Sequence, residues 1–144
     1  MGIWFTPPTV AELNARSQGT LVAHVGIEYI AVGDNAITAR MPVDRRTIQP
    51  AGILHGGASV VLAETLGSVA ANFCIDPRRQ MAVGMEINAN HVRPVREGHV
   101  TGTVSPVHTG KATHIWQIHI SDDDDRLVCI SRITMAVLDR PPRS

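Results

Sequence analysis

One carboxylate within a long stretch of small and apolar residues is the first candidate for chemistry. Glu64 is the only charged side chain between residues 56 and 75. An unpaired carboxylate is costly to bury, so Glu64 must be exposed, paired, protonated or functional. Ser68 follows four residues later, which places its hydroxyl on the same face of a helix. Such a pair can activate water; the alternative is a structural ion pair between Glu64 and an arginine.

The residues just before this stretch supply hydrogen-bond donors. Free N–H groups in the first turn of a helix carry the positive end of its dipole, and Gly56 and Gly57 leave room for an oxyanion to approach them. The two glycines could equally serve only a tight entry into the helix. His55 and Gln49 are weaker candidates, because a single histidine or glutamine is often structural. Together they predict donors at one helix end and a carboxylate about two turns inside.

The surrounding pattern predicts the elements that position these groups. Apolar content favours a helix over 55–75, and Thr9 with Glu12 has capping-box spacing for a short helix over about 9–17. A hairpin is expected from strands 21–32 and 36–43, followed by a loop over 42–52. Four further strands are expected in a meander, over residues 81–95, 98–107, 112–121 and 126–138. A polar tail is expected over 139–144. Their turns are predicted at Glu97-Gly98, 109–111 and 122–125.

This order of elements predicts an α+β fold in which one curved antiparallel sheet wraps one long central helix. At 144 residues the chain is expected to be a single domain, residues 1–144, that can bury roughly 68–70% of its unfolded surface. The helix is apolar on nearly all sides, and a chain of this length offers no second layer for its outer face. We therefore expect a homo-oligomer.

Composition argues against several classes of protein. Thirteen basic residues balance thirteen acidic ones, and two Trp, one Tyr and two Phe are the only aromatic residues apart from histidine, so neither nucleic acid nor a membrane is an expected partner. Cys74 and Cys129 lie 55 residues apart without metal-ligand spacing, which predicts free thiols in the cytoplasm and no metal site. The acidic run 122–125 is expected to be a solvated turn.

Two motifs carry a resemblance to a known family. The first runs from Gln49 to Glu64 and contains His55-Gly56-Gly57, with the glutamate nine residues after the histidine. The second is Asn-Ala-Asn-His-Val-Arg over 88–93. Together they resemble the hotdog-fold acyl-CoA thioesterases, in particular a subgroup of bacterial aryl-CoA hydrolases, and the resemblance extends from about residue 14 to 138.

The resemblance implies roles for the candidate residues. Glu64 would be the general base or nucleophile, and the Gly56 N–H would polarise the thioester carbonyl. Gln49 and His55 would orient the thioester and assist the leaving thiolate, while Ser68 would help to position water. No cofactor is implied, since coenzyme A is part of the substrate. The subunits would assemble at least as a dimer and further as a dimer of dimers, a homotetramer.

The resemblance also implies a binding site for coenzyme A. Gly84 would lie near the pantetheine arm. The nucleotide would contact two stretches of the chain: His91, Val92, Arg93 and Pro94 in the first, and His108, Thr109, Gly110, Lys111, Ala112 and Thr113 in the second. Lys111 is the only lysine in the chain and suits a phosphate contact. Ala112 stands where relatives often place a basic residue, and Arg93 and Arg96 could instead belong to a solvated strand edge.

Two other functions stay open at this point. One is a hotdog hydratase or dehydratase acting on an enoyl thioester, and the other is an acyl-CoA-binding protein without catalysis. His55 directly before the Gly-Gly helix start argues against the hydratase, and an intact Glu64 argues against the binding protein. The acyl group itself is not specified by these motifs.

Overall fold

The computed structural model describes residues 2–142. Residues 1, 143 and 144, which we predicted to be part of the domain and its tail, lie outside the described residues. The helices are α1 (Val10–Ser17), α2 (Leu21–His24) and α3 (Gly56–Phe73). The strands are β1 (Glu28–Val32), β2 (Ile37–Pro42), β3 (Gln80–His91), β4 (His99–Thr109), β5 (Thr113–Ser121) and β6 (Leu127–Asp139).

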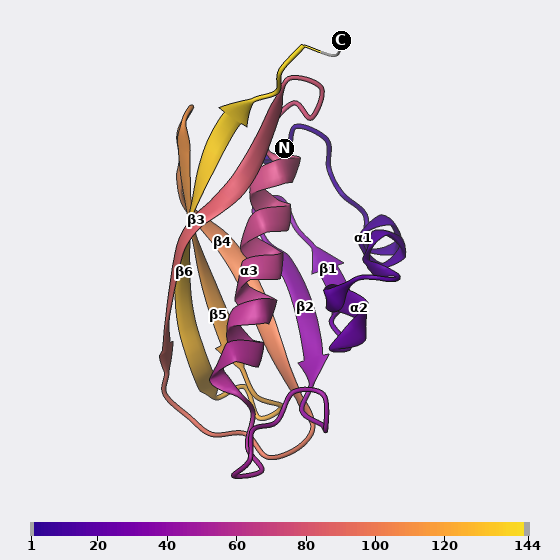
Figure 1. The fold of residues 1–144 in the computed structure, drawn as a ribbon, viewed down its shortest axis with the longest axis vertical. Coiled ribbons are helices and arrows are strands. Elements are labelled where there is room, and N and C mark those ends of the chain that lie inside the picture. Colours follow the sequence, from indigo (N-terminus) through magenta and orange to yellow (C-terminus); the bar gives the residue numbers. More distant parts are fainter. Residues whose placement is uncertain (1, 143–144) are drawn as a thin grey trace.

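The six strands form one sheet in the order β1-β2-β4-β5-β6-β3, and every neighbouring pair is antiparallel. Figure 1 shows α3 lying along this curved sheet, with α1 and α2 beside β1. The predicted α+β architecture with one long central helix is therefore confirmed. No helix among residues 2–142 is long and apolar enough to cross a membrane.

The predicted four-strand meander is wrong for its first strand. Only β4, β5 and β6 follow one another in the sheet, whereas β3 pairs with β6 at the far edge. Glu97-Gly98 is therefore not a hairpin turn, and β3 ends at His91 rather than at residue 95. The chain crosses the end of the molecule here, held by the Leu54 N–H donating to the Val95 carbonyl at 2.7 Å.

The strand predicted over 21–32 begins with a helix instead. Residues 21–24 form α2, and the Thr20 side chain caps it by accepting from the Val22 N–H at 3.2 Å. Gly19 before it and Gly26 after it have φ values of +75° and +80°, which only glycine adopts easily. Local capping and these two glycines decide the structure of a segment whose apolar residues alone suggest a strand.

The central helix matches the prediction closely, with His55 as its N-cap and Cys74 as its C-cap. Leu62, Leu66 and Ala70 are fully buried against the sheet. A Cβ at Gly67 would collide with Ile133, so the absence of a side chain lets α3 approach β6. In the described part of the chain no strand or helix covers the outer face of α3 (Figure 1).

Candidate active site

Glu64 lies on the outer half of α3 and is half-buried. Among residues 2–142 its carboxylate has no hydrogen-bond donor and no cation within 4 Å. It rests on β3 at Gly84, where a Cβ would lie 2.6 Å from its Oε1. The structural ion pair considered from the sequence is therefore not made within the described chain.

Glu64 and Ser68 line one cavity of about 460 Å³, as their spacing predicts. The cavity lies between α3, the α1–α2 segment and β1, and its apolar walls come from Leu13, Val22, Val69 and Phe73. Arg16 borders it, but its guanidinium lies 3.8 Å from Glu12 and stacks over the ring of Phe73 at 5.5 Å. The result is a free carboxylate with a neighbouring hydroxyl in an apolar hollow.

The N-terminus of α3 presents one free backbone donor. The Nδ1 of His55 accepts a hydrogen bond from the Gly57 N–H at 2.8 Å. That bond satisfies Gly57, whereas the Gly56 N–H has no acceptor among the described residues. The Gly56 N–H is therefore a free donor at this helix end, and His55 is the N-cap of the helix.

A second cavity, of about 350 Å³, opens at this helix end. It brings together Gln49, Gly56 and the segment 91–94, which contains His91, Val92, Arg93 and Pro94. The Gln49 Oε1 accepts from the Ala51 N–H at 2.7 Å, so its amide N–H groups remain available. The His91 ring lies over Gly56, with its Nε2 3.0 Å from where a Cβ would stand. These residues therefore line one cavity at the start of α3.

The second predicted nucleotide-binding stretch lies elsewhere. Residues 108–113 form the β4–β5 hairpin, and Thr109, Gly110 and Lys111 line a cavity of about 360 Å³ beside Cys74 and Ile75. Cys74 caps the C-terminus of α3, so this hairpin and segment 91–94 are at opposite ends of the helix. His108, Ala112 and Thr113 lie on the hairpin outside this cavity.

One chain alone does not bring the predicted site residues together. Gly56 and Glu64 are eight residues apart on α3, which corresponds to about 12 Å along its axis. The helix has 18 residues and is therefore about 27 Å long, which separates segment 91–94 from the hairpin. The predicted residues thus form three groups, at the start, middle and end of α3.

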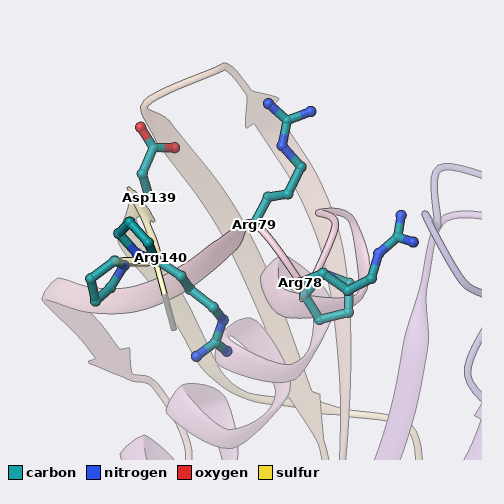
Figure 2. A pocket seen from close by; sticks show the side chains of 7 residues that line it. Arg78, Arg79, Asp139 and Arg140 are labelled. Atoms are coloured by element: carbon teal, nitrogen blue, oxygen red, sulfur yellow. The ribbon is translucent and has the colours of Figure 1, made fainter. Parts of the chain in front are cut away.

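A larger hollow, of about 890 Å³, is at another place and carries no predicted site residue. In Figure 2 the side chains of Arg79 and Arg140 extend to opposite sides of it. Arg78 is held by Asp76 at 2.8 Å, and the Arg140 Nε donates to the Gln80 carbonyl. Because these guanidinium groups do not converge, the hollow lacks the geometry of a phosphate site.

Neither cysteine is suited to be a nucleophile. Burial raises the pKa of the Cys74 thiol to about 11 and also raises the pKa of Cys129. Both thiols are therefore protonated near neutral pH, and a thiol is a poor nucleophile compared with a thiolate. The carboxylate of Glu64 therefore remains the candidate reactive group on the helix.

Two residues of the cavity that contains Glu64 were not predicted from the sequence. Tyr29 lines the cavity of Glu64, and so does Asn72, whose side chain bonds to the backbone of β3. Asn72 follows Glu64 by eight residues, a spacing that keeps both on one helix face and could have identified it. Nothing in the sequence near Tyr29 marks it as facing α3.

A curved antiparallel sheet around one helix that carries a free carboxylate places the chain among the hotdog-fold hydrolases. The family model described as the thioesterase superfamily matches residues 51–129, and the chain belongs to this family. It is a thioester hydrolase, as the resemblance implied.

Three relatives illustrate the similarity. The 1,4-dihydroxy-2-naphthoyl-CoA hydrolase of Escherichia coli is 51% identical over 94% of this chain and 99% of its own. The proofreading thioesterase EntH of Cronobacter turicensis is 49% identical over 94% and 98%. The crystal structure of a glutamine-to-alanine variant of a thioesterase from Pseudomonas aeruginosa superposes with a TM-score of 0.95, at 46% identity, over 96% and 100%.

Proposed function

We propose that this enzyme hydrolyses acyl-CoA thioesters, with aromatic acyl groups among its substrates, to a free acid and coenzyme A. The observation that carries the proposal is the unpaired carboxylate of Glu64 in an apolar cavity that also contains Ser68. The relative from Escherichia coli is named for an aromatic acyl-CoA, which supports the same class of substrate here.

The two halves of the site come from two copies of the chain in this proposal. Glu64 and the Gly56 N–H are about 12 Å apart on one helix, too far to act on the same carbonyl. A second copy that packs its α3 antiparallel against the first would bring Gly56 of one subunit to Glu64 of the other. The dimer would then hold two identical sites.

Two features of the chain support this pairing. The outer face of α3 is uncovered in the described chain, and β3 is an edge strand that pairs with β6 alone. A twelve-residue edge offers free backbone groups to a second copy. We propose a dimer through these features and a dimer of dimers beyond it. A cytoplasmic location agrees with free Cys74 and Cys129.

The chemistry follows from the groups in place. The Gly56 N–H would donate to the thioester oxygen and stabilise negative charge as the carbonyl carbon is attacked. Glu64 would either take a proton from water held beside Ser68, or attack the carbonyl itself and form an anhydride that water then opens. In both routes the C–S bond breaks and the sulfur of coenzyme A leaves as the thiol after gaining a proton.

Binding of the coenzyme A portion would also use two subunits. Arg93 is in the cavity that contains Gly56, and Lys111 is on the hairpin at the other end of α3. Antiparallel packing of two helices brings opposite ends together, so both groups could meet the phosphates of one ligand. His91, Val92, Pro94 and residues 108–113 would complete this surface, with Gly84 near the pantetheine arm.

Glu64→Gln tests the reaction. We expect the rate of thiol release from benzoyl-CoA to fall by at least about 100-fold, since a positioned base contributes about 10²–10⁴. Glu28→Gln is the matched control, because Glu28 is an exposed carboxylate paired with Arg40 at 3.0 Å and should leave the rate unchanged. A loss of less than about tenfold in Glu64→Gln would contradict the proposal.

The same assay separates the other functions. A hydratase would add water to an enoyl thioester without releasing thiol, and a binding protein would retain benzoyl-CoA without turnover. The Nδ1 of His55 already accepts a hydrogen bond from the Gly57 N–H, so this imidazole serves as a helix cap. A hydratase would need a histidine that works together with an acid, and this engagement therefore favours hydrolysis.

A further inference from the structure

The hydroxyl of Tyr29 has no partner although its side chain is almost completely buried. Tyr29 is the only tyrosine in the chain and is 2% exposed. Its Oη makes no hydrogen bond with the described residues. Among residues 2–142, the fully buried polar side-chain atoms that have no hydrogen-bond partner are His114 Nδ1 and Trp116 Nε1. The Tyr29 Oη is not among them, so this hydroxyl keeps some accessible surface, and Tyr29 lines the cavity that contains Glu64.

The backbone around Tyr29 fixes where this hydroxyl stands. Asn14 on α1 donates from Nδ2 to the Tyr29 carbonyl at 3.0 Å and accepts from the Tyr29 N–H at 2.9 Å. The register of β1 against β2 then shifts between Tyr29 and Ala31. These two bonds and the bulge hold the ring on the inner side of the sheet, facing the cavity.

The other hydroxyls of this wall already donate to the protein. Ser17 Oγ donates to the Leu13 carbonyl at 2.8 Å, and Thr20 Oγ1 donates to the Ser17 carbonyl at 2.6 Å. Tyr29 is thus the one hydroxyl on the β1 and α1–α2 side of the cavity that is free to donate to a ligand. The remaining wall is largely apolar.

We infer that Tyr29 is a specificity-determining residue that donates a hydrogen bond to an oxygen carried by the acyl group of the substrate. This inference rests on the proposed function, because it places the acyl group in the cavity of Glu64. An acyl group that fills the cavity with hydrocarbon alone would leave the Tyr29 hydroxyl buried without a partner. An aromatic ring with a hydroxyl substituent would satisfy it, so the selected class is the hydroxyaryl thioesters.

Two further observations agree with this role. Burial raises the pKa of Tyr29 to about 12, so the phenol stays protonated and remains a donor over the working pH range. The positive charge of Arg16 at the edge of the same cavity offsets only part of this rise in the pKa of Tyr29.

Tyr29→Phe removes the hydroxyl and keeps the ring. The test compares kcat/KM for benzoyl-CoA with kcat/KM for its 2-, 3- and 4-hydroxy derivatives. We expect the wild-type enzyme to prefer at least one hydroxylated substrate by about tenfold or more. In Tyr29→Phe this preference, taken as the ratio of the two kcat/KM values, should fall below about threefold. Thr103→Val is the matched control, since it deletes a hydroxyl from the outer face of the sheet.

Binding to the Glu64→Gln protein distinguishes this inference from the proposed function. Calorimetry with benzoyl-CoA and the preferred hydroxybenzoyl-CoA should show tighter binding of the hydroxylated ligand, and the difference should vanish in Glu64→Gln/Tyr29→Phe. That result supports the role of Tyr29 even if the wild-type protein hydrolyses neither compound. Equal binding of the two ligands, no binding of either, or a preference that survives Tyr29→Phe would overturn it.

Discussion

Contact between Glu64 and β3 depends on the absence of one side chain. A Cβ at Gly84 would lie 2.6 Å from the Glu64 Oε1 and would force that carboxylate to move. Because the clash is with the end of a flexible side chain, Gly84→Ala should fold with little loss of stability. We expect kcat/KM for benzoyl-CoA to fall by about tenfold or more, given the geometry that a base requires.

The effect of Gly84→Ala can be separated from a general effect of alanine. A Cβ at Gly33 has no neighbour closer than 3.8 Å, so Gly33→Ala should leave both activity and melting temperature near wild type. If Gly84→Ala retains full activity, Glu64 does not need the position it has against β3.

The ionisation of Tyr29 gives a prediction at alkaline pH. Its pKa is raised from 10.0 to about 12 because the ring is buried. The unfolded chain therefore loses this proton first, and the contribution of Tyr29 to stability is complete below pH 10 and is lost between pH 10 and about 12. Tyrosinate absorbance near 295 nm should rise with a midpoint well above 10 while the protein remains folded.

This signal has an internal control, since Tyr29 is the only tyrosine. Tyr29→Phe should abolish the absorbance change and remove its share of the stability loss between pH 10 and 12. A midpoint near 10 in protein that is still folded by circular dichroism would show that the hydroxyl is exposed to bulk water.

Among the individual residues, the sequence predicts Glu64 but not Tyr29, for a physical reason. Glu64 stands out because no other charge lies within a turn or two of it on a long apolar helix, and Ser68 is close to it by helical spacing alone. The importance of Tyr29 comes from what its hydroxyl lacks, and a missing partner is visible only when α1, β1 and α3 are packed together.

Two asparagines hold the two edge strands of the sheet in the same way. Asn14 bonds both backbone groups of Tyr29 on β1, and Asn72 bonds both backbone groups of Ala82 on β3 at 3.0 Å each. Each side chain takes the place of a neighbouring strand at one position of an edge. Each strand has a shift of register close to this point.

Removing one of these clamps should loosen the strand that supports Glu64. Asn72→Ala leaves the Ala82 N–H and carbonyl without their partner, two residues before Gly84. We expect a loss of about 1–3 kcal/mol in the free energy of unfolding, measured by urea denaturation, together with a lower kcat.

Asn35→Ala is the comparison for this clamp. Asn35 is exposed in the β1–β2 turn, and its replacement should change stability by no more than about 0.5 kcal/mol. Equal stability of Asn72→Ala and wild type would mean that β3 is held by β6 alone.

Individual elements and the hairpin pairs β1–β2, β4–β5 and β5–β6 were largely predictable, whereas the pairing of β3 with β6 and of β2 with β4 was not. The short helix was found from Thr9 and Glu12, and the structure confirms the bond from the Glu12 N–H to the Thr9 side chain at 3.1 Å. The wrong pairing of β3 arose because a turn signal at Glu97-Gly98 indicates a change of direction but not which strand lies next. That choice is made by packing around α3.

In the whole molecule, the predicted site residues lie apart along α3. Local motifs identified Gln49 and Gly56 at one end of a helix and Glu64 farther along it, and the structure places these groups in separate cavities. The distance between them is a property of the helix and cannot change within one chain. If Glu64 and the Gly56 N–H act on the same carbonyl, as we propose, a complete site requires a second copy.

Mixing two inactive variants tests whether the site is shared. Glu64→Gln removes the carboxylate from one half of the site, and Gln49→Ala alters the other half, so each variant alone should be nearly inactive. In a mixed dimer one site carries both substitutions, and the other has Glu64 from one subunit and Gln49 from its partner intact. With random exchange half of the dimers are mixed, so about a quarter of wild-type activity should return.

The recovery should require exchange of subunits. Unfolding the two variants together and refolding them should restore hydrolysis of benzoyl-CoA, whereas variants refolded separately and then combined at low temperature should stay inactive until subunits exchange. A double variant that carries both substitutions in one chain, refolded with wild type, provides the reference for dilution alone. If co-refolded single variants remain inactive while differently tagged subunits co-purify as mixed dimers, Glu64 and Gln49 act within one chain and the shared site is wrong.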